Sequence, residues 1–449
     1  MSKNLNKFII VLIIVSMMFA LAGCSEDAAE EQNVEGETKV TDTGYTTELT
    51  KDITSEAPDP EKLGEYFDEL LSHNSVNHST SVASFELFKK LAGPDIKDGK
   101  NTMISPISFM VAMGMLENGA AGDSLREIED AFGIKIEDFN EWYDAWYKVI
   151  KVTSEDSFNL ANSIWYKDAG GLYVEPDFLT KMGELYRAQA YSAPFDEKTV
   201  EDVNNWVKEN TNGMIDKVLD DIDKDMVMML LNAAVFEGKW AKEYKDDQIK
   251  KNQTFTMEDG TEQTVTMLES REERAEYYSN DLFKGTRKNY SNGFSIALLL
   301  PNEGLKVSEV IDEMSGKDFT GLLSDSVSAN VALTLPEFKF DYEAPNAIRS
   351  LKDMGVNTVF DEEKADLSPM AHMENGENLS VNQIIHKTHI ELDRKGTKAA
   401  AVTEIGIVMA TSAFGEVPEV ELTLDRPFIF AIMENDTDTP IFIGTVNNI

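Results

Sequence analysis

The sequence predicts an α+β fold built around one large mixed β-sheet. Apolar spacing typical of helices dominates the first half of the chain, and strand-like runs dominate the second half. Such segregation favours α+β over a parallel sheet of alternating strands and helices. No repeat and no Pro- or Gly-rich linker follows residue 61. Residues 61–449 are therefore predicted to form one domain of 389 residues.

Helices are predicted where apolar residues recur every three or four positions. These segments are residues 61–72, residues 109–116 behind the polar cap and proline of Ser105–Ser108, residues 204–209, and residues 348–354 before Gly355. Strands are predicted where β-branched and apolar residues run together. These segments are residues 159–165, 226–236, 294–300, 329–340, 384–392, 419–424 and 428–433.

The charge and the motifs exclude several classes of function. The chain has 41 Lys+Arg against 81 Asp+Glu, and its net charge of −40 repels nucleic acids, sulfated polysaccharides and acidic membranes. Its single cysteine closes no intrachain disulfide and builds no thiolate zinc cluster. His386 and His389 fall on opposite faces of one strand, which makes them poor co-ligands. Without a Gly-x-Ser-x-Gly, phosphate-loop or His-Glu-x-x-His motif, the sequence supports no catalysis, cofactor or metal.

Residues 1–23 are predicted to be a lipoprotein signal peptide. Lys3 and Lys7 precede an uncharged run of 16 residues, which is short for a membrane-spanning helix of about 20 residues and typical of a secretory signal. The run ends in Leu21-Ala22-Gly23-Cys24, which resembles the lipobox of bacterial lipoproteins and implies acylation of Cys24. An ordinary signal or anchor helix with an incidental cysteine is the alternative.

Residues 24–60 are predicted to be an acidic, disordered tether. From residue 25 to residue 60 the chain has 11 acidic residues against two lysines and shows no apolar periodicity. Such a segment buries too little surface to offset its ordering entropy, and it extends through self-repulsion. We therefore expect the domain to be secreted and held at the bacterial cell surface or envelope by a lipid on Cys24.

The long segment that follows the strand at 384–392 is patterned to become a further strand. Period-two alternation places Lys398 and Glu404 on one face. The other face carries no charge and consists of Thr397, Ala399, Ala401, Thr403, Ile405, Ile407 and Met409. Long connections inside a compact domain are uncommon and usually functional or disordered. Taken alone, the segment also fits an ordinary edge strand or an Ala-rich helical turn.

This segment resembles the hinge and reactive-centre loop of the serpin family, and further matches follow in the family's order. They are Asn101 with Ile104–Ser108, Ala161–Trp165, Asn205–Val207 with Thr211–Gly213, Leu231–Trp240, Leu335–Phe338, Ala365–Ser368, Ile385–Lys387 and Asp425–Phe428. The resemblance covers about residues 61–449. It implies the serpin fold, with a large central mixed sheet, two further sheets, about eight or nine helices and an exposed reactive-centre loop.

The resemblance implies a suicide inhibitor of serine endopeptidases and not an enzyme. A target protease attacks the loop and forms an acyl-enzyme, after which the freed loop inserts as a strand of the central sheet. Insertion of the loop drags the attached protease across the molecule and distorts its oxyanion hole. Hydrolysis of the acyl-enzyme then stalls. Inserting residues must be small or neutral, because a buried unpaired charge costs several kcal/mol.

The resemblance also assigns the residues of the loop. The hinge consists of Gly396, Thr397, Lys398, Ala399, Ala400, Ala401, Val402 and Thr403. The family usually has acidic residues where this chain has Arg394, Lys395 and Lys398, and Lys398 is expected to point outward. The family's spacing from the hinge glycine puts the reactive bond at Ala410-Thr411, with Met409 as the alternative specificity residue.

Apolar residues at the reactive bond suit elastase-like or subtilisin-like serine proteases, with papain-like cysteine proteases as secondary targets. By the same resemblance, a polar cluster lies beneath the opening sheet, and a Lys-Trp pair lies where the loop first enters. These residues are Ser105, Ser108, Asn232 and His386, and then Lys239 and Trp240. Core packing is the alternative explanation for both groups.

The expected partners are a target protease and, through the lipid anchor, a membrane; no nucleic acid is expected, and the protein is expected to be a monomer. Two other functions stay open. One is a non-inhibitory serpin-fold protein that proteases cleave as a substrate or that serves only as a binding module. The other is a lipid-anchored binding or hydrolytic protein.

Overall fold

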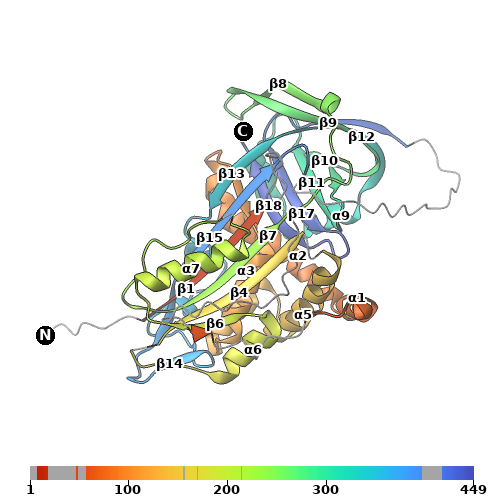
Figure 1. The fold of residues 1–449 in the computed structure, drawn as a ribbon. Coiled ribbons are helices and arrows are strands. Elements are labelled where there is room, and N and C mark those ends of the chain that lie inside the picture. Colours follow the sequence, from red (N-terminus) through yellow and green to blue (C-terminus); the bar gives the residue numbers. More distant parts are fainter. Residues whose placement is uncertain are drawn as a thin grey trace, which may run out of the picture.

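The computed structural model describes residues 8–18, 47–48, 57–154, 157–168, 170–213, 215–396 and 417–449. These residues form ten α-helices and three β-sheets, in agreement with the predicted α+β class (Figure 1). The helix count is slightly above the eight or nine expected. None of the helices in these ranges is long and apolar enough to cross a membrane.

Seven of the ten helices precede residue 211. They are α1 (Leu63–Ser72), α2 (Asn74–Lys97), α3 (Pro106–Asn118), α4 (Gly122–Phe132), α5 (Ile136–Thr153), α6 (Pro176–Tyr186) and α7 (Glu197–Asn210), followed by α8 (Val307–Glu313), α9 (Gly316–Ser324) and α10 (Ala347–Asp353). Short 3-10 helices span Pro60–Lys62, Asp246–Gln248 and Thr358–Phe360. The four predicted helical segments are confirmed within α1, α3, α7 and α10. The remaining helices were not predicted.

The central sheet is mixed and contains seven strands. Their order across the sheet is β13 (Phe338–Glu343), β15 (Leu379–Leu392), β1 (Phe8–Met18), β7 (Met226–Phe236), β4 (Phe158–Lys167), β6 (Gln189–Ala193) and β2 (Thr47–Glu48). Strand β1 runs parallel to both of its neighbours, whereas β13 with β15 and β4 with β7 are antiparallel.

The second sheet contains nine strands. Its order is β16 (Glu419–Thr423), β12 (Val327–Pro336), β9 (Glu262–Ser279), β10 (Phe283–Asn289), β11 (Phe294–Pro301), β17 (Phe428–Glu434), β18 (Pro440–Val446) and β3 (Thr102–Ile104), and β8 (Ile249–Thr256) pairs with β9. A small third sheet pairs β5 (Leu172–Val174) with β14 (Ala371–Met373). All seven predicted strand segments are confirmed, although the run at 329–340 is two strands separated at Glu337.

Helix α3 lies in the core between the two large sheets. Ser105 caps its first turn and Pro106 occupies the first helical position, where a missing N–H is tolerated. The helix packs against β1 and β7 of the central sheet and against β18 of the second sheet. Contact on several sides explains why its apolar residues surround the axis and do not form one stripe.

The opposite face of the central sheet is covered by α7. Trp206 and Val207 of this helix belong to a cluster of buried apolar residues that also contains Met229 and Leu231 of β7. Figure 1 shows α7 lying across β1, β7 and β4. Strand β7 is therefore buried on both faces, and accordingly its sequence is apolar except at Asn232.

Strand β1 comes from the segment that the sequence assigns to a leader. It fills the space between β7 and β15, and this space is called the slot below. Removal of a leader is a processing event, so the signal peptide remains a prediction, although in this structure residues 8–18 are part of the sheet. Of the predicted tether, the structure describes only Thr47–Glu48 and the residues from 57 onward.

Candidate functional site

A buried polar cluster lies under the slot, where the predicted sheet-opening residues meet. The Ser105 backbone N–H donates to His386 Nε2 at 3.1 Å. The Ser108 hydroxyl donates to Asn232 Oδ1, and Asn232 Nδ2 donates to Asn162 Oδ1 at 2.7 Å. All five side chains are buried. The structure thus places Ser105, Ser108, Asn232 and His386 next to one another; their role in sheet opening stays a prediction.

The cluster spans the slot because its members come from both flanking strands. Asn232 belongs to β7 and His386 to β15, while Ser105 and Ser108 belong to the start of α3. Ile14 of β1 is the register partner of both Asn232 and His386. A change in the separation of the two strands therefore has to rearrange these hydrogen bonds.

The imidazole of His386 is held neutral. Complete burial lowers the pKa of His386 to about 3, and a weaker interaction with the Ile14 backbone opposes this shift. Because Nε2 accepts the Ser105 hydrogen bond, the neutral ring carries its proton on Nδ1. The Phe109 ring meets the imidazole edge to face at 5.7 Å between ring centroids. His389, by contrast, contacts the Asp341 carboxylate through Nδ1.

Gly396 forms a tight turn after β15, at the end of the slot. Its φ of +83° lies in the left-handed region. A Cβ atom here would lie 2.3 Å from the Trp240 backbone nitrogen and 2.8 Å from the Gly238 carbonyl oxygen. Gly396 N–H donates to the Asp393 carbonyl at 3.2 Å, and Gly396 also bridges to Lys239. Glycine is therefore required by both conformation and close approach.

Trp240 anchors the turn from the other side. Its indole Nε1 donates to the Asp393 carbonyl at 2.9 Å, and its backbone N–H donates to the Lys395 carbonyl at 3.4 Å. The ring stacks on Tyr290 with centroids 4.6 Å apart. The Lys288 ammonium lies 5.2 Å from the indole centroid. The structure thus places Lys239 and Trp240 against the turn that contains Gly396; their role in loop entry stays a prediction.

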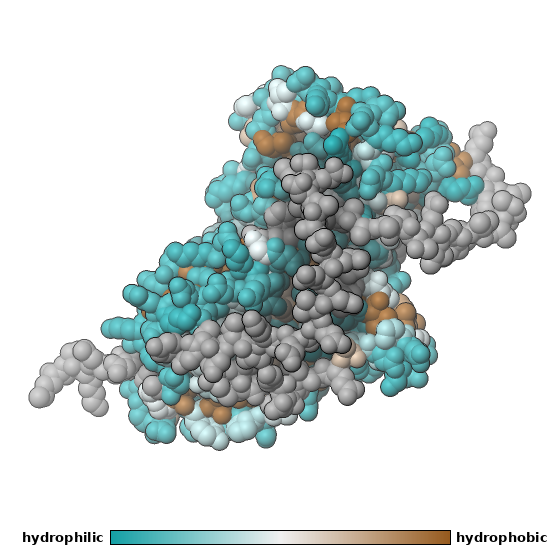
Figure 2. All heavy atoms as spheres, viewed as in Figure 1, coloured by the Kyte–Doolittle hydropathy of each residue, from teal (hydrophilic) through white to brown (hydrophobic). Residues whose placement is uncertain are grey.

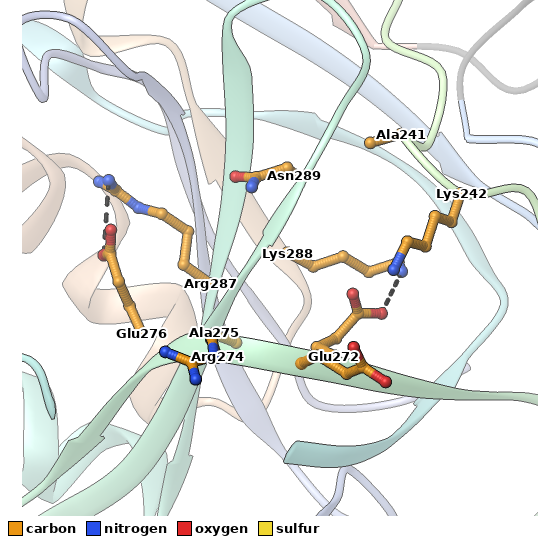
Figure 3. Close-up of a pocket in the computed structure, with 10 residues that line it drawn as sticks. Ala241, Lys242, Glu272, Arg274, Ala275, Glu276, Arg287, Lys288 and Asn289 are labelled. Atoms are coloured by element: carbon orange, nitrogen blue, oxygen red, sulfur yellow. Dashed lines mark hydrogen bonds and ion pairs between the residues drawn. The ribbon is translucent and has the colours of Figure 1, made fainter. Parts of the chain in front are cut away.

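A charged cavity of about 230 Å³ is lined by residues 241–242, 272–276 and 287–289 (Figure 3). Lys288, only 2% exposed, forms an ion pair with Glu272 at 2.5 Å, and Arg287 pairs with Glu276 at 3.6 Å. Burial lowers the pKa of Lys288, and the Glu272 carboxylate opposes that shift. Both cations therefore already have carboxylate partners, and the Lys288 ammonium also lies over the Trp240 ring.

Several predicted site residues lie outside the described residues. These are Thr397, Lys398, Ala399, Ala400, Ala401, Val402, Thr403, Met409, Ala410, Thr411 and Cys24. The basic residues that depart from the family pattern are partly described. Arg394 pairs with Asp246 at 3.3 Å, and its backbone N–H donates to Glu337. The Lys395 N–H donates to Asp393 Oδ1 at 2.7 Å.

Sequence reasoning missed Asn162, Asp393, Tyr290 and Lys288. Asn162 extends the polar cluster to the Tyr186 carbonyl, and the other three surround Trp240. Nothing in the spacing of these residues marks them, because each acts through a partner that is distant along the chain. Within the described ranges, no group of three or more His, Cys, Asp and Glu residues could hold a metal ion.

The geometry defines a class of protein. Its central sheet accommodates an additional strand, and a glycine in a tight turn held against a tryptophan lies at one end of that strand. A model of the family "Serpin (serine protease inhibitor)" matches residues 78–449. The chain therefore belongs to the serpin family. Members of this family are generally protease inhibitors and not enzymes, although some serpins are non-inhibitory.

Individual relatives span most of the chain. An uncharacterized serpin-like protein of Thermococcus kodakarensis is 27% identical and covers 84% of this chain and 85% of its own length. Glia-derived nexin of Homo sapiens is 28% identical, with coverage of 84% and 94%. The crystal structure of the thermophilic serpin tengpin in its native state is 37% identical, with a TM-score of 0.74 and coverage of 84% and 94%.

Replacing the hinge glycine is expected to destabilise the turn. Gly396→Ala adds a Cβ that clashes with the Trp240 backbone, and it also incurs left-handed strain. Gly376→Ala is the matched control, because Gly376 has φ +74° and open space around it. We expect Gly396→Ala to lower the free energy of unfolding by about 1–3 kcal/mol more than the control in urea titrations. Equal losses would show that the close approach to Trp240 contributes nothing.

The buried imidazole is expected to make stability fall with acidification. Unfolded His386 takes up a proton below pH 6.5, whereas folded His386 stays neutral down to about pH 3. Its contribution to stability is therefore lost as the pH falls, by about 2 kcal/mol between pH 7 and pH 5. The Glu434 carboxyl, whose pKa burial raises to about 7, titrates in the same window with the opposite sign.

The test is consequently a difference between variants measured by urea unfolding. The free energy of unfolding of the wild type minus that of His386→Gln is expected to fall by about 2 kcal/mol from pH 7 to pH 5. His78→Gln, at an exposed histidine, serves as the control. The difference in free energy of unfolding between the wild type and His78→Gln should be the same at both pH values. A pH-independent difference for His386→Gln contradicts the assignment of a neutral buried imidazole.

Proposed function

We propose that this protein is a suicide inhibitor of serine endopeptidases that prefer small or apolar residues. The reactive bond is Ala410-Thr411, with Met409 as the alternative specificity residue. One observation carries the proposal: the central sheet accommodates an eleven-residue strand between β7 and β15, and β15 leads into the hinge glycine at the end of that slot. A loop that folds back from Gly396 would enter antiparallel to β15.

The chemistry of the slot agrees with the sequence of the loop. The slot is lined on both faces by buried apolar side chains, and β1 shows that successive strand residues there are buried on alternating faces. An inserting residue therefore cannot carry an unpaired charge. Thr397, Ala399, Ala401 and Thr403 meet this requirement on one face, while Lys398 on the other has to reach water beside α7.

Inhibition is expected to leave a covalent complex. The protein is mixed with elastase or subtilisin and run on a denaturing gel, where a band near the summed mass is expected and trypsin should give none. Thr397→Arg should convert the inhibitor into a substrate, because it inserts a charge at the first inward position. Simple clipping of the wild type supports the non-inhibitory alternative, and no reaction in the loop argues against both.

We also propose that the protein is secreted and anchored at the bacterial surface through a lipid on Cys24. The support is the uncharged run that ends at the only cysteine, followed by the acidic stretch. Cys24→Ser should move the protein from the membrane fraction to the soluble fraction, whereas Ser25→Ala should not. The lipid anchor is contradicted if the Cys24→Ser protein stays in the membrane fraction and the mass of the wild-type protein shows no acylation.

A further inference from the structure

The strongest unexplained feature of the structure is the segment that fills the slot. In Figure 1, β1 lies between β15 and β7 in the middle of the central sheet. All eleven residues of Phe8–Met18 have register partners in β15, and ten have partners in β7. Both edges that a reactive-centre loop would use are therefore paired with the leader.

The leader also fills both faces of the sheet. Ile10, Leu12 and Ile14 join the core on the α3 side, and Val11 and Ile13 join the cluster on the α7 side. Each of these five side chains is at most 1% exposed. A strand buried on both faces has to be continuously apolar, and the β-branched run of this leader meets that demand.

The loop is a weaker candidate for the same space. Its alternating residues after Gly396 are mainly threonine and alanine, which bury less apolar surface than isoleucine, leucine and valine. Its direction also differs, because β1 runs parallel to β15 whereas a loop turning back from β15 would run antiparallel. One slot accommodates one strand, so the two segments exclude each other.

The leader fills the slot up to its hinge end. Met18 is the register partner of Ile390 and of Phe236. Ile390 lies two residues before the end of β15, and Phe236 is the last residue of β7, four residues before Trp240. A loop entering from Gly396 would meet a paired strand almost immediately.

We propose that the uncleaved leader acts as an intramolecular strand that keeps the reactive-centre loop out of the central sheet. Removal of the leader before Cys24 then opens the slot. The precursor is thereby held in a state that cannot insert its loop until the leader has been cleaved. This inference rests on the proposed function for its biological meaning, but occupancy of the slot can be measured separately.

The test compares the full chain of residues 1–449 with Leu12→Asp, which places a charge in the buried centre of β1 and should expel it. Leu12→Val is the matched control that keeps the strand apolar. Ile13→Asp, on the α7 side, is a second expelling variant should the first fail to fold. Hydrogen exchange of the amides of residues 9–18 is followed by mass spectrometry.

We expect these amides in the wild type and in Leu12→Val to exchange at least about a hundredfold more slowly than in the expelling variants. The second measurement is the thermal unfolding temperature before and after subtilisin cuts the loop. Cleavage should raise it in the expelling variants, where the cut loop can enter the sheet, and should leave the wild type nearly unchanged. This readout does not require the protein to be an inhibitor.

Fast exchange of residues 9–18 in the wild type overturns the proposal, as does an equal gain in unfolding temperature for the wild type and Leu12→Asp after cleavage. If only the expelling variants gain stability but no form traps a protease covalently, the proposal about the leader is upheld and the proposed inhibitory function fails. Covalent trapping by the expelling variants and not by the wild type upholds both.

Discussion

The architecture of the central sheet depends on the backbone hydrogen bonds of the two strand edges that face each other across the slot. Every residue of β7 is buried, and alternate residues of β15 from Ile384 to Leu392 are buried as well, so the facing N–H and C=O groups of the two strands have little access to water as partners. An unpaired buried strand edge is costly, and these edges must therefore pair with each other or with an intervening strand. In this structure the intervening strand is β1.

The polar cluster connects the state of the slot with the rest of the core. Asn232 and His386 project from the two flanking strands, and both reach the N-terminal turn of α3. Because the imidazole is neutral and completely buried, its hydrogen bond to Ser105 has no competition from solvent. The separation of the strands and the position of α3 are thus linked through a few short contacts.

The hinge is built where the two flanking strands reach the same end of the sheet. Strand β15 continues into the Asp393–Gly396 turn, and the segment after β7 supplies Trp240 to hold that turn. The indole is itself held by Tyr290 and by the Lys288 ammonium. The face of the molecule seen in Figure 2 is largely hydrophilic where it is not grey, in agreement with the net charge of −40. An acidic surface of this strength disfavours self-association.

The local sequence pattern was sufficient to predict a helix or strand wherever the surroundings of the segment are nearly uniform. The bounds of β7 agree with the sequence prediction because each of its residues is buried, and α3 was found from its serine cap and proline. Helix α2 was not predicted, because buried polar residues such as Thr80 and Ser84 interrupt its apolar spacing. Their hydroxyls donate to carbonyls one turn earlier, so burial is tolerated without an apolar pattern.

By itself, the sequence determined the α+β class, the family resemblance and the apolar character of residues 8–18. The tertiary structure decided that residues 8–18 lie between β7 and β15 and that Gly396 contacts Trp240. An apolar, β-branched run satisfies a membrane-targeting signal and a buried strand equally well. The folded chain brings together the facing edges of residues 226–236 and 379–392, whose N–H and C=O groups need hydrogen-bond partners. The apolar run of residues 8–18 supplies those partners, which its sequence alone does not reveal.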